Sequence, residues 1–176
     1  HRTLTRLAMP TPDEQQLKLS DLTPFGVGGR RLCFVHPHDP TKCIKVLRTD
    51  ERRTVRTRKS PFIPAALRRV YDNNADELRE LLAIEKRIGR NAMSHNLPLQ
   101  HGMIDTDLGP GLVLDLIRDQ DGGIARSVRE LITNGLPLTE IKPAFDDLGA
   151  FLLSHRIVTR QILDHNIAAR HIGKGQ

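Results

Sequence analysis

The chain of 176 residues carries 27 Lys and Arg against 21 Asp and Glu, a formal net charge of +6, and 38% of its residues are hydrophobic. This balance is typical of a soluble globular protein with a buried core, and the positive charge favours anionic partners such as phosphates. No apolar run approaches the ~18 residues of a membrane span, and the two cysteines make no disulfide framework, so we expect a cytoplasmic protein without membrane contact.

The N-terminal part of the chain predicts an arm followed by a meander of strands. Residues 1–16 are polar, contain prolines and show no sustained period, which is typical of a loose arm. Extended runs then lead into the glycine-rich Phe25 to Gly29, and follow at Leu32 to Val35 and at Cys43 to Leu47. Glycine and proline turns between such runs favour an antiparallel sheet.

A basic segment follows, and it predicts an exposed loop. Prolines at 61 and 64 exclude a helix directly after it. Few aromatic residues accompany these cations, so the segment is weak evidence for nucleic-acid binding. Binding of an acidic protein partner is the alternative. The cations of this loop are Arg52, Arg53, Arg56, Arg58 and Lys59.

The middle of the chain predicts one helix and then further strands. The helix begins near Asn74, with Glu77 at the spacing of a capping box, and ends at Gly89. Its apolar face comprises Leu78, Leu81, Leu82 and Ile88. Strand-like runs follow at 99–100, 103–104 and 112–117.

The last part of the chain predicts a hinge and then helices. Residues 118–123 are polar and end in two glycines, which is typical of a hinge. Apolar residues recur at helical spacing beyond it, and they predict one helix over about 126–134 and another from about 139 or 143 to 155.

One group of residues has the pattern of a phosphate-binding site. A glycine turn between strands, here Gly26, Gly28 and Gly29, lets backbone amides approach a phosphate, and Lys45 on a following strand can add a point charge to the same oxygens. A lysine directed into a cleft needs an anionic partner, and Glu80 on the predicted helix is available, with Glu77 and Glu85 as competitors.

Three segments resemble the YrbL family, the PhoP regulatory network proteins, whose fold is related to that of protein kinases. They are Pro24 to Leu47, Asn96 to Gly122 and Arg156 to Ile167. The resemblance implies that the three glycines cover phosphates, that Lys45 contacts them, and that Glu80 holds Lys45. It also implies that the strand Leu114, Asp115, Leu116 and Ile117 enters a hinge that receives adenine.

The chain departs from the kinase pattern where catalysis is concerned. Asn166 stands where a kinase holds a magnesium ion, but the position of the catalytic base five residues earlier is Gln161, whose amide cannot accept the proton. Asp164 lies two residues before Asn166, not five, so it could serve as the base only if this loop had a different conformation from that of a kinase. Arg31 stands in place of the third glycine, and no second metal-binding segment follows before Gln176.

The fold expected from these features is α+β and protein-kinase-like. It comprises an arm at 1–16, an N-terminal lobe at 17–117 with an antiparallel sheet and one helix, a hinge at 118–123, and an incomplete helical C-terminal lobe at 124–176 that points to a truncated chain. The function expected is that of a bacterial regulatory protein with an ATP and magnesium site and impaired catalysis.

Three alternatives stay open at this point. The chain can be a non-enzymatic module that binds a protein or nucleic acid through the basic loop, or a small-molecule kinase that uses Asp164. A zinc site is the third, because Cys33, His36, His38 and Cys43 are zinc-ligand types close together in sequence. Their spacing matches no standard zinc finger, and small buried cysteines and turn histidines explain them as well.

Overall fold

The computed structural model describes residues 16–49, 72–159 and 167–170. Its centre is one sheet of five strands: β1 (Gly26–Val27), β2 (Arg31–His36), β3 (Asp39–Leu47), β4 (Gln100–Ile104) and β5 (Gly111–Asp115). The strands lie in the order β1-β2-β3-β5-β4, and each neighbouring pair is antiparallel. The α+β class and the antiparallel sheet predicted from the sequence are therefore confirmed.

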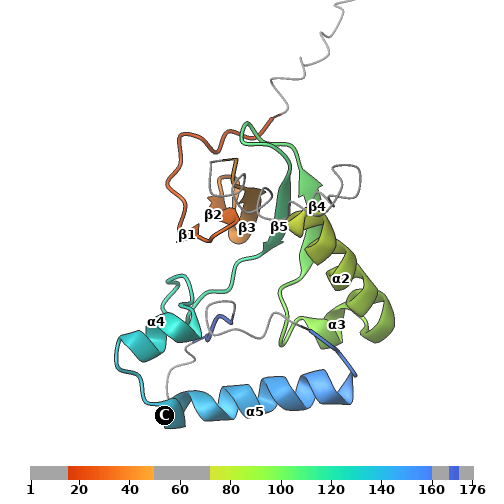
Figure 1. Ribbon diagram of the computed structural model, residues 1–176, viewed down its shortest axis with the longest axis vertical. Helices are drawn as coiled ribbons and strands as arrows, with labels where there is room; N and C mark the ends of the chain where they lie inside the picture. Colours follow the sequence, from red (N-terminus) through yellow and green to blue (C-terminus); the bar gives the residue numbers. More distant parts are fainter. Residues whose placement is uncertain (1–15, 50–71, 160–166, 171–176) are drawn as a thin grey trace, which may run out of the picture.

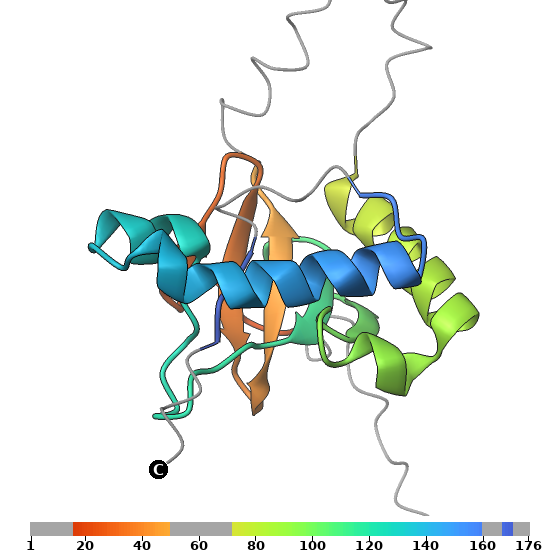
Figure 2. The ribbon, with the colours of Figure 1, turned by 90° about the horizontal axis from the view of Figure 1, so that it is seen from below.

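Four helices complete the described part of the chain. They are α2 (Asn73–Ile88), α3 (Arg90–Met93), α4 (Val128–Thr133) and α5 (Leu138–Ser154). Helices α2 and α3 pack beside the sheet, whereas α4 and α5 lie beyond one end of it, and α5 runs across that end (Figures 1 and 2). No helix in these residues has the length and apolar character to cross a membrane.

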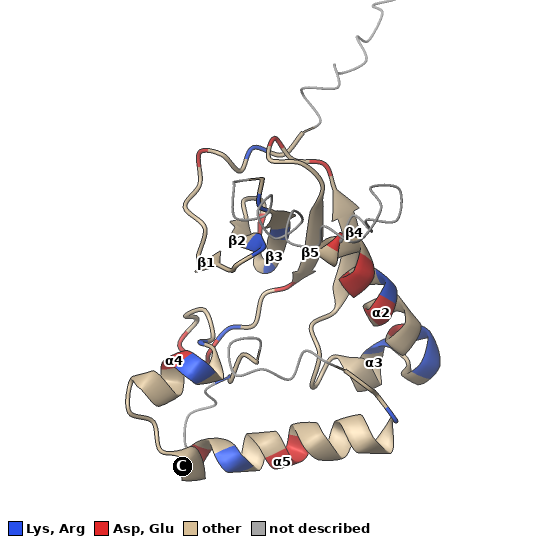
Figure 3. Cartoon of the chain, in the orientation of Figure 1, with Lys and Arg blue, Asp and Glu red and all other residues tan. Residues whose placement is uncertain are grey.

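Helix α2 begins near Asn74, as predicted, but another residue caps it. Asp72 is the N-cap, and its side chain accepts hydrogen bonds from the amides of Asn74 and Ala75. Asn74 lies in the first turn, where its side chain is fully buried, and the capping box expected between Asn74 and Glu77 does not form. Figure 3 shows acidic residues near the start of α2 and basic residues in its last turn, an arrangement that complements the helix dipole.

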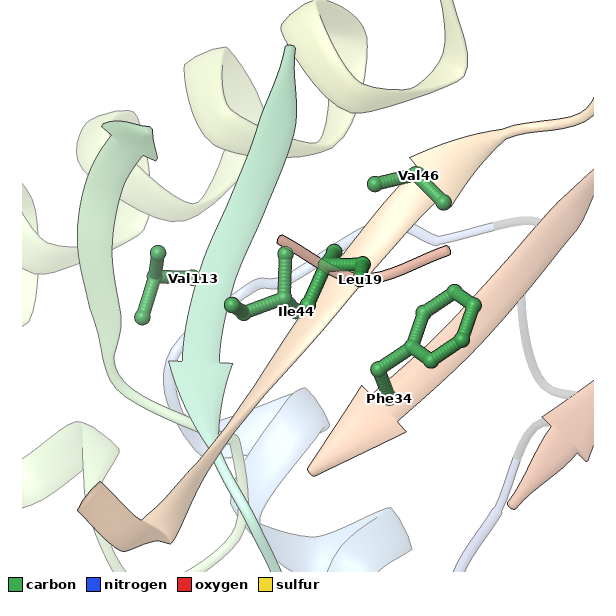
Figure 4. Packing of buried hydrophobic residues seen from close by; sticks show 5 residues of the cluster. All are labelled: Leu19, Phe34, Ile44, Val46 and Val113. Carbon is green, nitrogen blue, oxygen red and sulfur yellow. The ribbon is translucent and has the colours of Figure 1, made fainter. Parts of the chain in front are cut away.

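The sheet buries a different set of side chains on each face, as the alternation along a strand requires. One face packs the cluster of Figure 4, in which Leu19 from the segment before β1 lies over β2, β3 and β5; its members are Leu19, Phe34, Ile44, Val46 and Val113. The other face packs against α2 and α3 through Cys43, Leu81, Met93, Leu112 and Leu114. Leu82, predicted on the apolar face of α2, is instead 47% exposed.

The segment before β1 is fixed by the loop between β4 and β5. Leu17 exchanges backbone hydrogen bonds with Asp105 and Asp107, and the Asp107 carboxylate accepts from the amides of Leu19 and Ser20. These bonds hold Leu19 over the sheet, where its side chain is completely buried.

The polar stretch at 118–123 forms a closed turn. Arg118 pairs with Ile124, and the amide of Ala125 donates to the carbonyl of Ile117 at 3.0 Å. The Arg118 guanidinium also donates to the carbonyl oxygens of Pro40, at the start of β3, and of Gly122. The turn is therefore fastened to the sheet.

Both helices predicted beyond the turn are confirmed. A capping box between Ser127 and Glu130 starts α4. Helix α5 begins at Leu138, so Pro143 lies inside it. A proline in the second turn removes one backbone hydrogen bond, but its fixed φ suits a helix. The segment at 126–127 pairs with residues 168–169 through the bridge between Ser127 and Ala168.

Candidate functional site

The glycine, cysteine and lysine singled out in the sequence lie in one row across the sheet. Gly26 on β1 is opposite Cys33 on β2, and Cys33 is opposite Lys45 on β3. Directly opposed residues of an antiparallel pair project from the same face, and this is the face that packs against α2. A Cβ at Gly26 would lie 3.3 Å from the Cβ of Cys33, so a glycine keeps this corner open.

Lys45 is held by α2, but its partner is Glu77. The Lys45 Nζ donates to Glu77 Oε1 at 2.9 Å, and the two side chains are 22% and 24% exposed. Glu80, the partner expected from the sequence, is exposed. The prediction of Glu80 was therefore wrong, because Glu80 projects about 100° around the helix from Leu81, whereas Glu77 lies one turn before that buried leucine.

Arg31 is a second cation on the same carboxylate. Its Nη1 forms an ion pair with Glu77 Oε2 and lies 3.5 Å from Asn74 Oδ1. The residue that the sequence comparison with kinases places at a third glycine therefore carries a side chain that reaches Glu77. The three charged groups are each about a quarter exposed and sum to +1.

The electrostatics of the cluster follow from this pairing. Burial alone raises the pKa of Glu77, but the charges and hydrogen bonds of Lys45 and Arg31 more than offset it, so its pKa is lowered. Glu77 is consequently ionised at neutral pH. One carboxylate cannot neutralise two cations, and the excess positive charge makes this spot attractive to an anion.

Asn74 positions the lysine from the same helix. Its Nδ2 donates to the carbonyl oxygen of Lys45 at 2.7 Å, and the side chain is fully buried. Both the backbone and the side chain of Lys45 are thereby bound to the first turns of α2. A polar residue at the start of a helix suggests a cap, so sequence reasoning offered no signal for this contact.

The glycine turn exposes amide donors. The amide of Gly28 donates to the carbonyl of Arg31 at 2.9 Å, and Arg48 Nη1 donates to the carbonyl of Gly28 at 3.0 Å. The amides of Gly29 and Arg30, at the tip, donate to no residue that the structure describes. Two adjacent free amides are the groups that a phosphate-binding turn presents.

Strand β5 ends at Asp115, two residues before the predicted end at Ile117, and one amide donor of residues 115–117 has no partner among the described residues. The amides of Asp115 and Leu116 donate to the carbonyls of Leu99 and Thr41. The Asp115 carboxylate accepts from the Leu99 amide and lies 2.7 Å from His101 Nε2. Within the described segments the amide of Ile117 has no acceptor.

The residue set considered for zinc does not form a metal cluster in the described part of the chain. His36 Nδ1 accepts a hydrogen bond from the amide of His38, so the hairpin uses this ring to close its own turn. Cys43 is buried on the α2 face, and burial raises the pKa of its thiol to about 11. Burial also raises the pKa of Cys33.

Several predicted site residues lie outside the residues that the structure describes. They are Gln161, Asp164, Asn166 and the basic loop at 52–59. The magnesium and catalytic roles assigned to them stay predictions.

Comparison with known proteins gives the family. Residues 17–176 match the family of the PhoP regulatory network protein YrbL. The chain belongs to this family. It is 26% identical over 167 residues to the uncharacterized protein YrbL of Escherichia coli strain K12 and to that of Shigella flexneri, covering 91% of this chain and 69% of each relative. No solved structure matches the chain significantly.

The YrbL family assignment covers both the sheet and the helices of this chain. The residues that sequence reasoning missed are Arg31 and Asn74, and Glu77 was named only as a competitor. A signal for Glu77 existed, since it precedes the predicted core residue Leu81 by four positions and so shares its side of the helix.

Proposed function

We propose that this chain binds a nucleoside triphosphate such as ATP on the face of the sheet that carries Lys45. The observation that supports this most directly is the ion pair between Lys45 on β3 and Glu77 on α2, at 2.9 Å. In a protein kinase the equivalent pair positions the lysine on the phosphates. The amides of Gly29 and Arg30, which donate to no described residue, would add hydrogen bonds to the same oxygens.

The base of the nucleotide would lie against Asp115, at the end of β5, and the two residues after it, Leu116 and Ile117. The amide of Ile117 is available to a ring nitrogen, since no described residue accepts from it. The order of elements supports a kinase-like architecture as part of this proposal: strands, the helix carrying the acid, further strands, a linking turn and helices.

The proposed protein binds nucleotide but transfers phosphate poorly. Asn166 would hold a magnesium ion together with phosphate oxygens, and that ion would neutralise charge on the phosphates. Gln161 at the position of the base lacks the basicity to accept the proton of a substrate hydroxyl. The regulatory role that the family name suggests would then depend on whether a nucleotide is bound at the site.

Thermal unfolding with and without magnesium and ATP tests the proposal. Ligand at about 100 times its dissociation constant adds ~2.7 kcal/mol, and each kcal/mol raises the Tm of a chain of this size by roughly 2–4 °C. We expect this shift in the parent and its loss in Lys45→Ala. Each variant is compared with its own ligand-free Tm, so a change in basal stability does not enter.

Lys86→Ala is the matched control, because Lys86 is an exposed lysine in the last turn of α2. It should keep the full shift. A folded parent without a shift at millimolar ATP, or an equal shift in Lys45→Ala, would contradict the proposal. Turnover of ATP that requires Asp164 would instead support the small-molecule kinase.

A further inference from the structure

Arg31 enters the site from the strand beside Lys45. Arg31 and Cys33 are two positions apart on β2, so both side chains project from the face that carries Lys45. The Arg31 guanidinium contacts the Glu77 oxygen that Lys45 does not. Lys45 takes Oε1 and Arg31 takes Oε2. The two cations therefore converge on one point from neighbouring strands.

Most of the donors of this pair are unused. A guanidinium has five N–H groups, and Arg31 directs only Nη1 at Glu77 and Asn74; its Nε and Nη2 have no partner among the described residues. Lys45 Nζ has three N–H groups and donates to Glu77 alone within the same residues. The two side chains are 25% and 22% exposed, and the remaining donors are accessible to water or to a ligand.

We propose that Arg31 is a second phosphate-binding cation, which makes the site select ligands by their number of phosphates. The inference rests on the proposed function and deepens it. A planar guanidinium matches two oxygens of a phosphate, while the lysine supplies a point charge. The excess charge of the cluster is then neutralised by the ligand.

The position of Arg31 favours the terminal phosphates over the base. The residue begins β2 directly after the glycine turn, and its carbonyl accepts from the amide of Gly28 at 2.9 Å. The base end of the proposed site lies on β5 and beyond, two strands away in the sheet order. A ligand without phosphates would gain nothing from Arg31.

The test is calorimetric titration of ATP, AMP, adenosine and inorganic triphosphate into the parent and into Arg31→Gln. Loss of one charge-assisted contact should weaken ATP and triphosphate by about 10- to 100-fold and leave adenosine unchanged. Arg87→Gln is the matched control, since Arg87 is an exposed arginine in the last turn of α2 and should change ATP affinity less than about twofold.

Arg31→Lys guards against a folding defect in the glutamine variant. It keeps the charge beside Glu77 and removes the planar fork, so we expect an intermediate loss of ATP affinity with unchanged adenosine affinity. If Arg31 were only a structural partner of Glu77, its substitution would change stability but not the ratio of ATP affinity to adenosine affinity. An unchanged ratio would therefore overturn the inference.

The outcomes separate this inference from the proposed function. If the parent and both Arg31 variants bind ATP equally, the result contradicts phosphate binding by Arg31 and still supports nucleotide binding by the chain. If triphosphate binding depends on Arg31 and ATP binds no more tightly than triphosphate, the result supports a phosphate-binding site and contradicts recognition of the nucleoside. A folded parent that binds none of the four ligands overturns both.

Discussion

Lys45 and Asn74 are joined through the backbone: the Asn74 Nδ2 donates to the carbonyl oxygen of Lys45 at 2.7 Å. The Lys45 side chain reaches Glu77, one helical turn further along α2. A single residue of β3 is therefore bound twice by the first turns of one helix. Beside the apolar packing through Leu81, these polar contacts both dock α2 on the sheet and shape the candidate site.

Glu77→Gln should destabilise the protein by roughly 1–3 kcal/mol at pH 7, because two cations then share a neutral amide. Glu80→Gln, three residues along the same helix, should change the free energy of unfolding by less than about 0.5 kcal/mol, since Glu80 is exposed. Urea denaturation of both variants measures the difference. Equal effects of the two substitutions would contradict the pairing.

The contribution of Glu77 should depend on pH in one direction. Its pKa in the folded protein lies below the ordinary 4.5, so the carboxylate stabilises the fold fully above that value. As the pH falls through the folded pKa, the carboxyl becomes protonated and the stabilisation is lost. The gap in unfolding free energy between the parent and Glu77→Gln should therefore narrow below pH 4.5. A gap that widens on acidification would refute this assignment.

Gly111→Ala should destabilise the sheet by about 1–3 kcal/mol through overpacking. A Cβ at Gly111 would lie 2.5 Å from Cγ2 of Ile44, which is fully buried and has no room to move. Gly29→Ala is the control, because a Cβ there meets nothing within 4 Å. Denaturation midpoints should fall for Gly111→Ala alone, and a similar fall for Gly29→Ala would argue against the packing described for β5.

The two cysteines should react with a maleimide at different rates. Cys33 is partly exposed beside Lys45, whereas Cys43 is buried with a pKa of about 11. Labelling followed by peptide mass spectrometry should find Cys33 modified first and Cys43 only on unfolding, with rates that rise with pH as the thiolate forms. If ATP binds as proposed, it should slow labelling of Cys33. Preferential labelling of Cys43 in the folded protein would be incompatible with the core.

The sequence predicted the regular elements well where a local pattern decides them. The runs at 32–35 and 43–47 became β2 and β3, and the periodic segments became α2, α4 and α5. The register between strands is not local. It depends on which faces are buried together, and so the row through Gly26, Cys33 and Lys45 emerged only from the folded sheet.

The candidate site was half predictable for the same reason. The glycine turn and Lys45 have a spacing along the chain that suggests phosphate chemistry. The choice of Glu77 over Glu80 depends on the rotation of α2 about its axis, which the burial of Asn74 and Leu81 fixes. Arg31 replaces a glycine in the motif, so a pattern search registers it as a loss, whereas the structure shows an added charge.

Arg118 has a mechanical consequence for the molecule. Its guanidinium connects the turn after β5 to the carbonyl of Pro40, at the beginning of the strand that carries Lys45. The turn that precedes α4 is therefore joined to the sheet at two points, to β5 through the chain and to β3 through this side chain. Without the arginine, the turn would lose its side-chain contact with β3, while Lys45, Glu77 and Arg31 would keep the contacts they make with one another.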